Sequence, residues 1–155
     1  MSQVDRLLEA SRRRLDRVDP VQAHQIVAEG GLLIDIRPAA QRAEFGEVPG
    51  ALVVERNNLE WRLDPDGTHR LDDAADGDRP VVIMCQEGFA SSLAAASLLD
   101  LGRTRATDLV GGFAAWQAAG LPTVPAPRGG PDAKGPARRP VLSNDSVSND
   151  SGGEP

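Results

Sequence analysis

Short apolar runs alternate with helical patterns along residues 1–124 of the chain. Runs bounded by Gly, Pro or polar turn residues predict buried strands over residues 32–36, 51–54, 81–84 and 107–110. Apolar positions at helical spacing predict helices over residues 4–17, 20–27, 59–63, 89–101 and 113–119. This alternation predicts an α/β fold, with a mainly parallel central sheet and helices on both faces.

The N-terminal segment, residues 1–18, is expected to form a helix that packs on the domain. Its apolar positions fall near one face of that helix: Val4, Leu7, Leu8, Leu15 and Val18. Arg12, Arg13 and Arg14 lie mostly off this stripe, and such a run is most simply a solvated face. An anion-binding or nucleic-acid-binding patch is the alternative.

Domain boundaries follow from two changes in the pattern. Asp19 and Pro20 form a helix start, with an N-cap residue followed by proline, so the domain is predicted over residues 19–124. From Pro125 onward Pro, Gly, Ser, Asn and Asp dominate. Such a composition buries too little apolar surface to fold, so residues 125–155 are predicted to be a disordered tail.

Composition narrows the class of protein. Charged residues make up 26% and apolar residues 40%, which is typical of a soluble globular domain. The net charge of −6 argues against nucleic acid as a partner, because phosphate binding needs a basic face. No apolar stretch approaches the roughly 18 residues of a membrane span, and no secretory signal is visible. The expected location is the cytoplasm, with no membrane partner.

Cys85 is the only cysteine of the chain. It lies where the predicted strand 81–84 gives way to a short loop and the predicted helix 89–101. Backbone N–H groups and the positive end of the helix dipole then face the sulfur, which favours the thiolate. Gly88 gives the loop tight curvature. The sequence therefore nominates Cys85 as a nucleophile.

A metal or redox-pair role for Cys85 is not expected. The chain has no second cysteine for a redox pair. Zinc needs about three or four ligands, whereas His24 and His69 are the only histidines. We expect neither a metal nor any other cofactor.

Several short motifs occur in an order and spacing that resemble the rhodanese-like domain family, the single-domain sulfurtransferases. Asp35-Ile36-Arg37 is similar to the family's Asp-x-Arg, and the cysteine loop is similar to its Cys-x-x-Gly-x-Arg-Ser. The other motifs are Gly46-Glu47-Val48-Pro49-Gly50-Ala51, Gly111-Gly112-Phe113-Ala114-Ala115-Trp116 and Gly120-Leu121-Pro122. The resemblance covers residues 19–122 and implies the rhodanese-like α/β fold.

The resemblance also implies a reaction. Cys85 would take a sulfane sulfur from a small donor, hold it as a persulfide and pass it to cyanide, a thiol or a protein acceptor. The substrate-binding residues expected in the loop are Gln86, Glu87, Gly88, Phe89, Ala90 and Ser91. Arg37 and Arg56 are two further candidates. Their alternatives are structural, because Arg37 could hold loops together with Asp35, and Arg56 could simply be solvated.

The cysteine loop departs from the family pattern at two positions. Ala90 stands where the family often has an arginine, and Arg56 and Arg62 are candidates to replace the missing cation. Glu87 adds a negative charge that repels a dianionic donor such as thiosulfate. These departures keep open a second class, a binding or sulfide-sensing module with a weakly reactive cysteine. Related phosphatases end this loop in arginine, which phosphoryl transfer requires, so Ala90 and Ser91 argue against that class.

Overall fold

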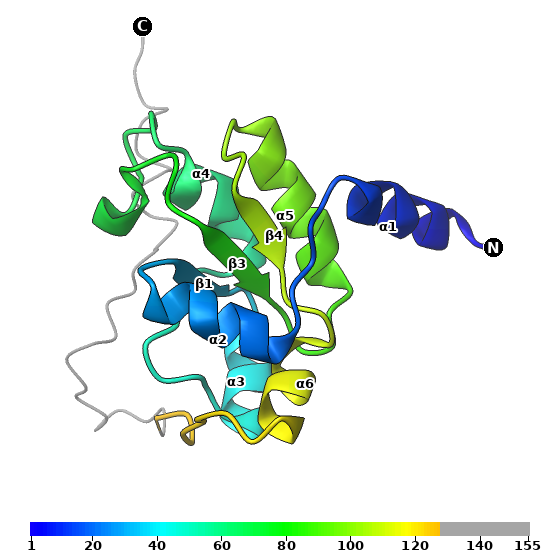
Figure 1. Cartoon of the computed structure of the whole chain (residues 1–155), viewed down its shortest axis with the longest axis vertical. Helices are drawn as coiled ribbons and strands as arrows, with labels where there is room; N and C mark the ends of the chain where they lie inside the picture. Colours follow the sequence, from blue (N-terminus) through cyan, green and yellow to red (C-terminus); the bar gives the residue numbers. More distant parts are fainter. Residues whose placement is uncertain (128–155) are drawn as a thin grey trace, which may run out of the picture.

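A parallel sheet lies at the centre of the molecule, with helices on both faces (Figure 1). The computed structural model describes residues 1–127 of the 155-residue chain. The sheet has the strand order β2-β1-β3-β4, with β1 at Leu32–Asp35, β2 at Leu52–Val53, β3 at Val81–Met84 and β4 at Ala106–Asp108. All neighbouring strands pair in parallel, which confirms the predicted α/β class. Residues 128–155, where most of the predicted disordered tail falls, lie outside the described residues.

Helices connect the strands. In chain order they are α1 (Gln3–Arg13), α2 (Pro20–Ala28), α3 (Ala39–Phe45), α4 (Leu59–Leu63), α5 (Ala90–Asp100) and α6 (Gly112–Ala118), with short 3-10 helices η1 (Arg56–Asn58) and η2 (Asp72–Ala74). The sequence patterns predicted each α-helix except α3. Among residues 1–127 no helix has the length and apolar character that crossing a bilayer requires.

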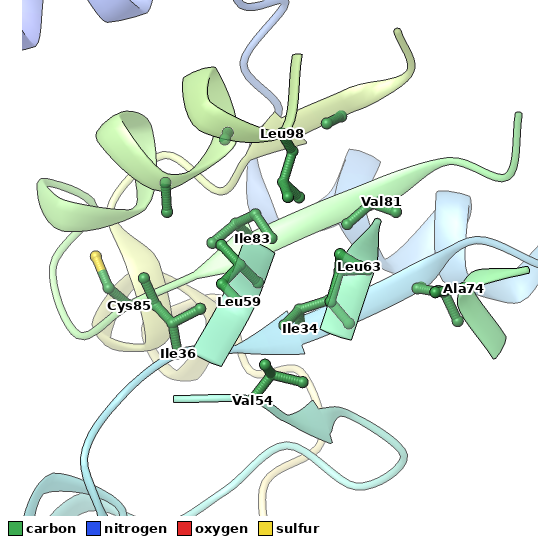
Figure 2. Close-up of a cluster of buried hydrophobic side chains, with 14 of the residues drawn as sticks. Ile34, Ile36, Val54, Leu59, Leu63, Ala74, Val81, Ile83, Cys85 and Leu98 are labelled. Carbon is green, nitrogen blue, oxygen red and sulfur yellow. The ribbon is translucent and has the colours of Figure 1, made fainter. Parts of the chain in front are cut away.

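One face of the sheet packs against α4 and α5 (Figure 2). The strands contribute Ile34, Val81 and Ile83, each fully buried, to a cluster of aliphatic side chains. Burying one such side chain stabilises the fold by about 1.5–3 kcal/mol. Figure 2 shows Cys85 at one end of this cluster, near Ile36. The thiol therefore lies where the core ends and the loop begins.

The other face packs against α2 and α6. Leu33, Val82 and Met84 alternate with the residues of the first face and contact Phe113 and Trp116. Because both faces are covered, the residues of β1 and β3 are all buried, which explains their continuous apolar runs.

The N-terminal helix α1 extends beyond the body of the molecule and lies beside α5 (Figure 1). Ser11 and Leu15 are buried, whereas Val4 is 63% exposed and Leu7 is 56% exposed. The first half of the predicted apolar stripe is therefore exposed, whereas Leu15, near its end, is buried. Only the C-terminal half of α1 and the residues after it reach the core.

The segment after α1 joins the sheet at the carboxyl end of β4. The N–H of Val18 donates to the carbonyl of Asp108 at 3.1 Å, and the N–H of Val110 donates to the carbonyl of Val18 at 2.8 Å. These bonds form an isolated parallel bridge between Val18 and Leu109. The bridge brings Arg17 next to the end of β4, where its side chain becomes part of the site.

Candidate active site

Cys85 follows β3 directly, at the carboxyl end of the sheet, where ligands of parallel α/β sheets bind. Its side chain is only 8% exposed. The N–H groups of Gly88 and Ser91 donate to Sγ at 3.2 and 3.3 Å. Ser91 belongs to the first turn of α5, so the positive end of that helix also faces the sulfur. The arrangement stabilises a negative charge on Sγ.

The carbonyl groups at the start of the cysteine loop, residues 85–91, are held by α6. The N–H of Phe113 donates to the carbonyl of Cys85 at 2.9 Å, and the N–H of Ala114 donates to that of Gln86 at 3.1 Å. In a trans peptide the C=O and N–H bonds point in opposite directions. The N–H groups of Gln86 and Glu87 therefore point away from α6.

Several N–H groups of the loop have no acceptor within the described residues. They belong to Gln86, Glu87, Phe89 and Ala90. Together with the N–H groups of Gly88 and Ser91 they form a continuous series of donors around the thiol. Consecutive free N–H groups of this kind bind anions, because each carries a partial positive charge and needs an acceptor.

Two glycines let the loop approach the start of α6 closely. Gly88 has φ +90°, and a Cβ there would lie 2.6 Å from the backbone nitrogen of Gly111. A Cβ on Gly112, at φ +62°, would overlap the carbonyl of Cys85. Side chains at these positions would force the loop and α6 apart, so the arrangement of the N–H donors depends on both glycines.

The buried side chain of Arg37 joins the end of β1 to the cysteine loop. Its guanidinium makes two hydrogen bonds to the carboxylate of Asp35, at 3.0 and 2.7 Å, and a third to Oε1 of Gln86 at 3.0 Å. It also donates to the carbonyl of Gly46 at 2.8 Å and stacks on the ring of Phe113, 4.3 Å from its centroid. The side chain has no exposed surface. Arg37 thus contacts the loop rather than solvent, which fits the loop-holding alternative and not a position on the rim.

Asp108, at the end of β4, holds the other side of the loop. Its buried carboxylate accepts hydrogen bonds from Nε and Nη2 of Arg17 at 2.8 and 3.1 Å. It also accepts from the hydroxyl groups of Ser91 and Ser92, both at 2.8 Å. The carboxylate therefore fixes the first turn of α5 while its charge is balanced by Arg17.

Arg12, on α1, reaches the same loop from outside. Its Nη2 donates to the carbonyl of Gly88 at 2.7 Å, and its Nε donates to the hydroxyl of Ser92 at 3.0 Å. Arg17 donates to the same Gly88 carbonyl at 3.1 Å. Burial lowers the pKa of Arg12, as does repulsion by Arg17, whereas Asp108 and Cys85 act in the opposite direction. The guanidinium still carries its charge near neutral pH.

The structure brings most of the predicted site residues together but leaves Arg56 apart. Glu87, Phe89 and Ala90 are exposed on the loop, and Gln86 is half-buried under the hydrogen bond from Arg37. Arg56 pairs with Glu60 at 2.9 Å instead, and no contact of the described residues joins it to the loop.

Sequence reasoning missed three residues of the site. Arg12 was expected on a solvated face, and Arg17 and Asp108 were not singled out. Their positions depend on the bridge between Val18 and Leu109, which joins distant segments. The only local signal was the Arg12-Arg13-Arg14 run, whose first member is the one that turns inward.

No group of three or more metal-ligating side chains occurs within residues 1–127. His24 is exposed and lies edge-on to Trp116, with 5.6 Å between the ring centroids.

The family model for the rhodanese-like domain matches residues 19–119. The thiosulfate sulfurtransferase GlpE of Actinobacillus succinogenes is 30% identical over 106 residues, which cover 68% of this chain and 86% of that protein. A sulfurtransferase of Allochromatium vinosum is 38% identical over 101 residues, which cover 65% and 84%. The chain belongs to the rhodanese-like domain family. The family match leaves out α1 and Arg17, which precede its first residue.

Solved structures agree on the fold. A Rhodopseudomonas palustris protein, described as of unknown function and a possible tyrosine phosphatase, superposes with a TM-score of 0.72 at 26% identity, covering 80% of this chain and 96% of that one. A thiosulfate sulfurtransferase from Pseudomonas aeruginosa superposes with a TM-score of 0.57 at 28% identity, covering 71% of this chain and 19% of that one.

Proposed function

We propose that this protein is a sulfurtransferase that carries sulfane sulfur as a persulfide on Cys85. The observation that carries the proposal is a single thiol, 8% exposed, inside a loop whose N–H groups either donate to Sγ or have no acceptor within the described residues. Family membership and the sulfurtransferase names of the relatives support it.

The first half of the reaction loads the cysteine. With thiosulfate as donor, the Cys85 thiolate attacks the outer sulfur, a new S–S bond forms, and the bond to the sulfite group breaks. Sulfite leaves with the electron pair of that bond. The product is Cys85-S-S⁻, whose terminal sulfur keeps one negative charge. The free N–H groups of Gln86, Glu87, Phe89 and Ala90 would donate hydrogen bonds to that negatively charged sulfur.

The second half of the reaction removes the sulfur from Cys85. A nucleophile such as cyanide or a thiolate attacks the terminal sulfur, the S–S bond breaks, and Cys85 leaves as the thiolate. No side-chain general base is needed, because the attacking group and the leaving group are both anions. The absence of a second cysteine also protects the persulfide from discharge into an internal disulfide. A cytoplasmic location and a role in sulfur metabolism are proposed with this chemistry, because a free thiol persists in reducing surroundings.

The donor class is proposed from the relatives. Thiosulfate is the donor that the name of the GlpE relatives gives, and a small anionic sulfur compound fits the N–H donors of the loop. Glu87 disfavours an anionic donor, because its exposed carboxylate lies on the same loop and repels negative charge. A small thiol or cyanide is the proposed acceptor, and a protein thiol is a further candidate.

Phosphoryl transfer is not supported by the loop. A transferring phosphoryl group needs a guanidinium or metal that binds its equatorial oxygens. The loop residues Ala90 and Ser91 offer neither.

Intact-protein mass spectrometry tests the proposal. The folded protein is incubated in turn with thiosulfate, mercaptopyruvate and polysulfide, and we expect a mass increase of one sulfur atom that reductant removes. Added cyanide should discharge the loaded protein and yield thiocyanate. Cys85→Ser should abolish both results while its circular dichroism spectrum stays that of the parent. A folded parent protein that takes up sulfur from none of the three donors would instead support the binding or sulfide-sensing module.

A further inference from the structure

The cysteine loop lacks the arginine that its family often places within it, yet two guanidinium groups contact it from the N-terminal segment. Both Arg12 and Arg17 donate to the carbonyl of Gly88, at 2.7 and 3.1 Å. Neither belongs to residues 19–119, which the family model matches. The contacts join residues that are 76 and 71 positions apart.

The two arginines differ in their charge balance. Arg17 forms a paired hydrogen bond with the carboxylate of Asp108, so its charge is largely neutralised. The partners of Arg12 within the described residues are all neutral: the carbonyl of Gly88, the hydroxyl of Ser92 and the ring of Phe89, whose centroid is 5.6 Å from Cζ. Arg12 therefore has no carboxylate as a hydrogen-bond partner within this part of the chain, and the nearby Asp108, which attracts its charge, is already bound to Arg17. Cys85 is near enough to act electrostatically on this guanidinium.

The hydrogen bonds of Arg12 also orient the backbone. The carbonyl of Gly88 points to the arginines, so the N–H of Phe89, in the same trans peptide, points the opposite way. This N–H is one of the free donors of the loop. A second bond, to the hydroxyl of Ser92, ties the same guanidinium to the first turn of α5. Lysine would keep the charge but would not hold both acceptors in this fixed geometry, because its ammonium group lacks the planar fork of donors.

We propose that Arg12 positions the Gly88–Phe89 peptide and supplies the positive charge that Ala90 leaves missing, so that α1 is part of the site and favours sulfur donors with an anionic group. This role deepens the proposed function and rests on it for the substrate, but not for the contacts. The cation comes from α1 and not from Arg56 or Arg62. Arg62 donates to the carbonyl of His69, and Arg56 pairs with Glu60.

The test compares two alkylating reagents on the full chain. Iodoacetate is an anion and iodoacetamide is neutral, and both react with the thiolate of the only cysteine. The ratio of their rates cancels the thiolate population and reports the local potential at Cys85. We expect Arg12→Gln to lower the iodoacetate-to-iodoacetamide ratio by roughly twofold to tenfold, the scale on which local charge steers small anions. High salt should lower the ratio of the parent protein in the same direction.

Two further variants separate charge from position. Arg12→Lys keeps the charge and should keep the alkylation ratio, but it should lower kcat for thiosulfate with little change in KM, because the Gly88–Phe89 peptide is no longer held. Arg12→Gln should lower kcat for thiosulfate and also raise its KM. Arg14→Gln is the matched control, since Arg14 also ties α1 to α5, through Asp100 at 2.6 Å, but does not contact the loop. Arg14→Gln should change neither the iodoacetate-to-iodoacetamide ratio nor kcat and KM for thiosulfate.

Each result supports or overturns one of the two roles proposed for Arg12. An unchanged alkylation ratio in folded Arg12→Gln overturns the charge role, and an unchanged kcat in Arg12→Lys overturns the positioning role. If Arg12→Gln does not fold, a ratio in the parent protein that does not respond to salt overturns the charge role. If the parent protein transfers no sulfur, the proposed function fails, while the alkylation ratios still test Arg12.

Discussion

Nη1 of Arg37 donates a hydrogen bond to Oε1 of Gln86 at 3.0 Å, and this bond joins the end of β1 to the residue after the nucleophile. The same guanidinium is bound to Asp35, which is also buried. One buried cation therefore fixes two strand ends and the start of the cysteine loop together. The position of the loop that carries Cys85 thus depends on a side chain with no exposed surface.

Replacing this cation should cost stability as well as activity. Arg37→Met leaves the carboxylate of Asp35 buried without its partner, which typically costs about 3–5 kcal/mol. We expect the free energy of unfolding in urea to fall by about that amount. The control is Arg56→Met, because the Arg56 side chain is 42% exposed and pairs with Glu60. Its loss should cost about 0–1 kcal/mol. Equal losses in the two variants would contradict the structural role of Arg37.

Gly88 offers a prediction about the shape of the loop. Gly88→Ala places a Cβ 2.6 Å from the nitrogen of Gly111, so loop and α6 must separate and sulfur transfer should be nearly lost. The matched control is Gly50→Ala, because Gly50 has φ +86° but no atom within 4 Å of the added Cβ. It should show only the backbone strain, about 1–2 kcal/mol, and keep its activity. Steady-state kinetics with both variants, after a check of folding, measures the difference.

Glu87 is predicted to limit the rate with anionic donors. Glu87→Gln removes the negative charge of the loop, so kcat/KM for thiosulfate should rise by roughly twofold to tenfold at low ionic strength and less at high salt. Glu29→Gln is the control, because Glu29 follows α2 near the opposite, amino-terminal edge of the sheet. An equal gain in both variants would point to the net charge of the protein instead of the loop.

Glu60 gives a prediction on stability and pH. Burial raises the pKa of Glu60, but hydrogen bonds from Ser97 and Arg56 and the charge of Arg56 outweigh it and hold that pKa below its ordinary value. Because the folded pKa is depressed, Glu60 stabilises the fold above the unfolded pKa of about 4.3, and this contribution is lost as the pH falls through the folded value.

The stability gap between the parent and Glu60→Gln should therefore be largest near neutral pH and shrink in acid. Urea unfolding at a series of pH values measures it. Glu44→Gln, an exposed position on α3, is measured in parallel as the matched control. A gap that grows as the pH falls would contradict the assigned direction.

The sequence predicted the sheet because its two central strands come from short apolar runs bounded by Gly, Pro or polar residues, and every residue of both strands is buried. It predicted the place of Cys85 for a related reason, since a strand that ends in a glycine-containing loop before a helix has few alternative geometries. It did not predict α3, because no residue of Ala39–Phe45 is buried and the helix has no apolar stripe to detect.

The role of the arginines was harder to predict. Arg37 is more buried than most leucines of the chain, yet arginine ordinarily indicates surface. Arg12 and Arg17 reach the loop only because the chain passes along β4 before α2 begins, a path that local patterns do not encode. Contacts that span 71 to 91 residues are properties of the whole fold.

The bridge between Val18 and Leu109 has a consequence for the order of folding. Contacts between distant segments form late, because the entropy of closing a long loop opposes them until the rest of the chain is in place. The cysteine loop can therefore acquire its full set of partners only after α1, β3 and β4 have met. Until these segments meet, the loop lacks the hydrogen bonds from Arg12 and Arg17 to Gly88 and the bond from Ser91 to Asp108.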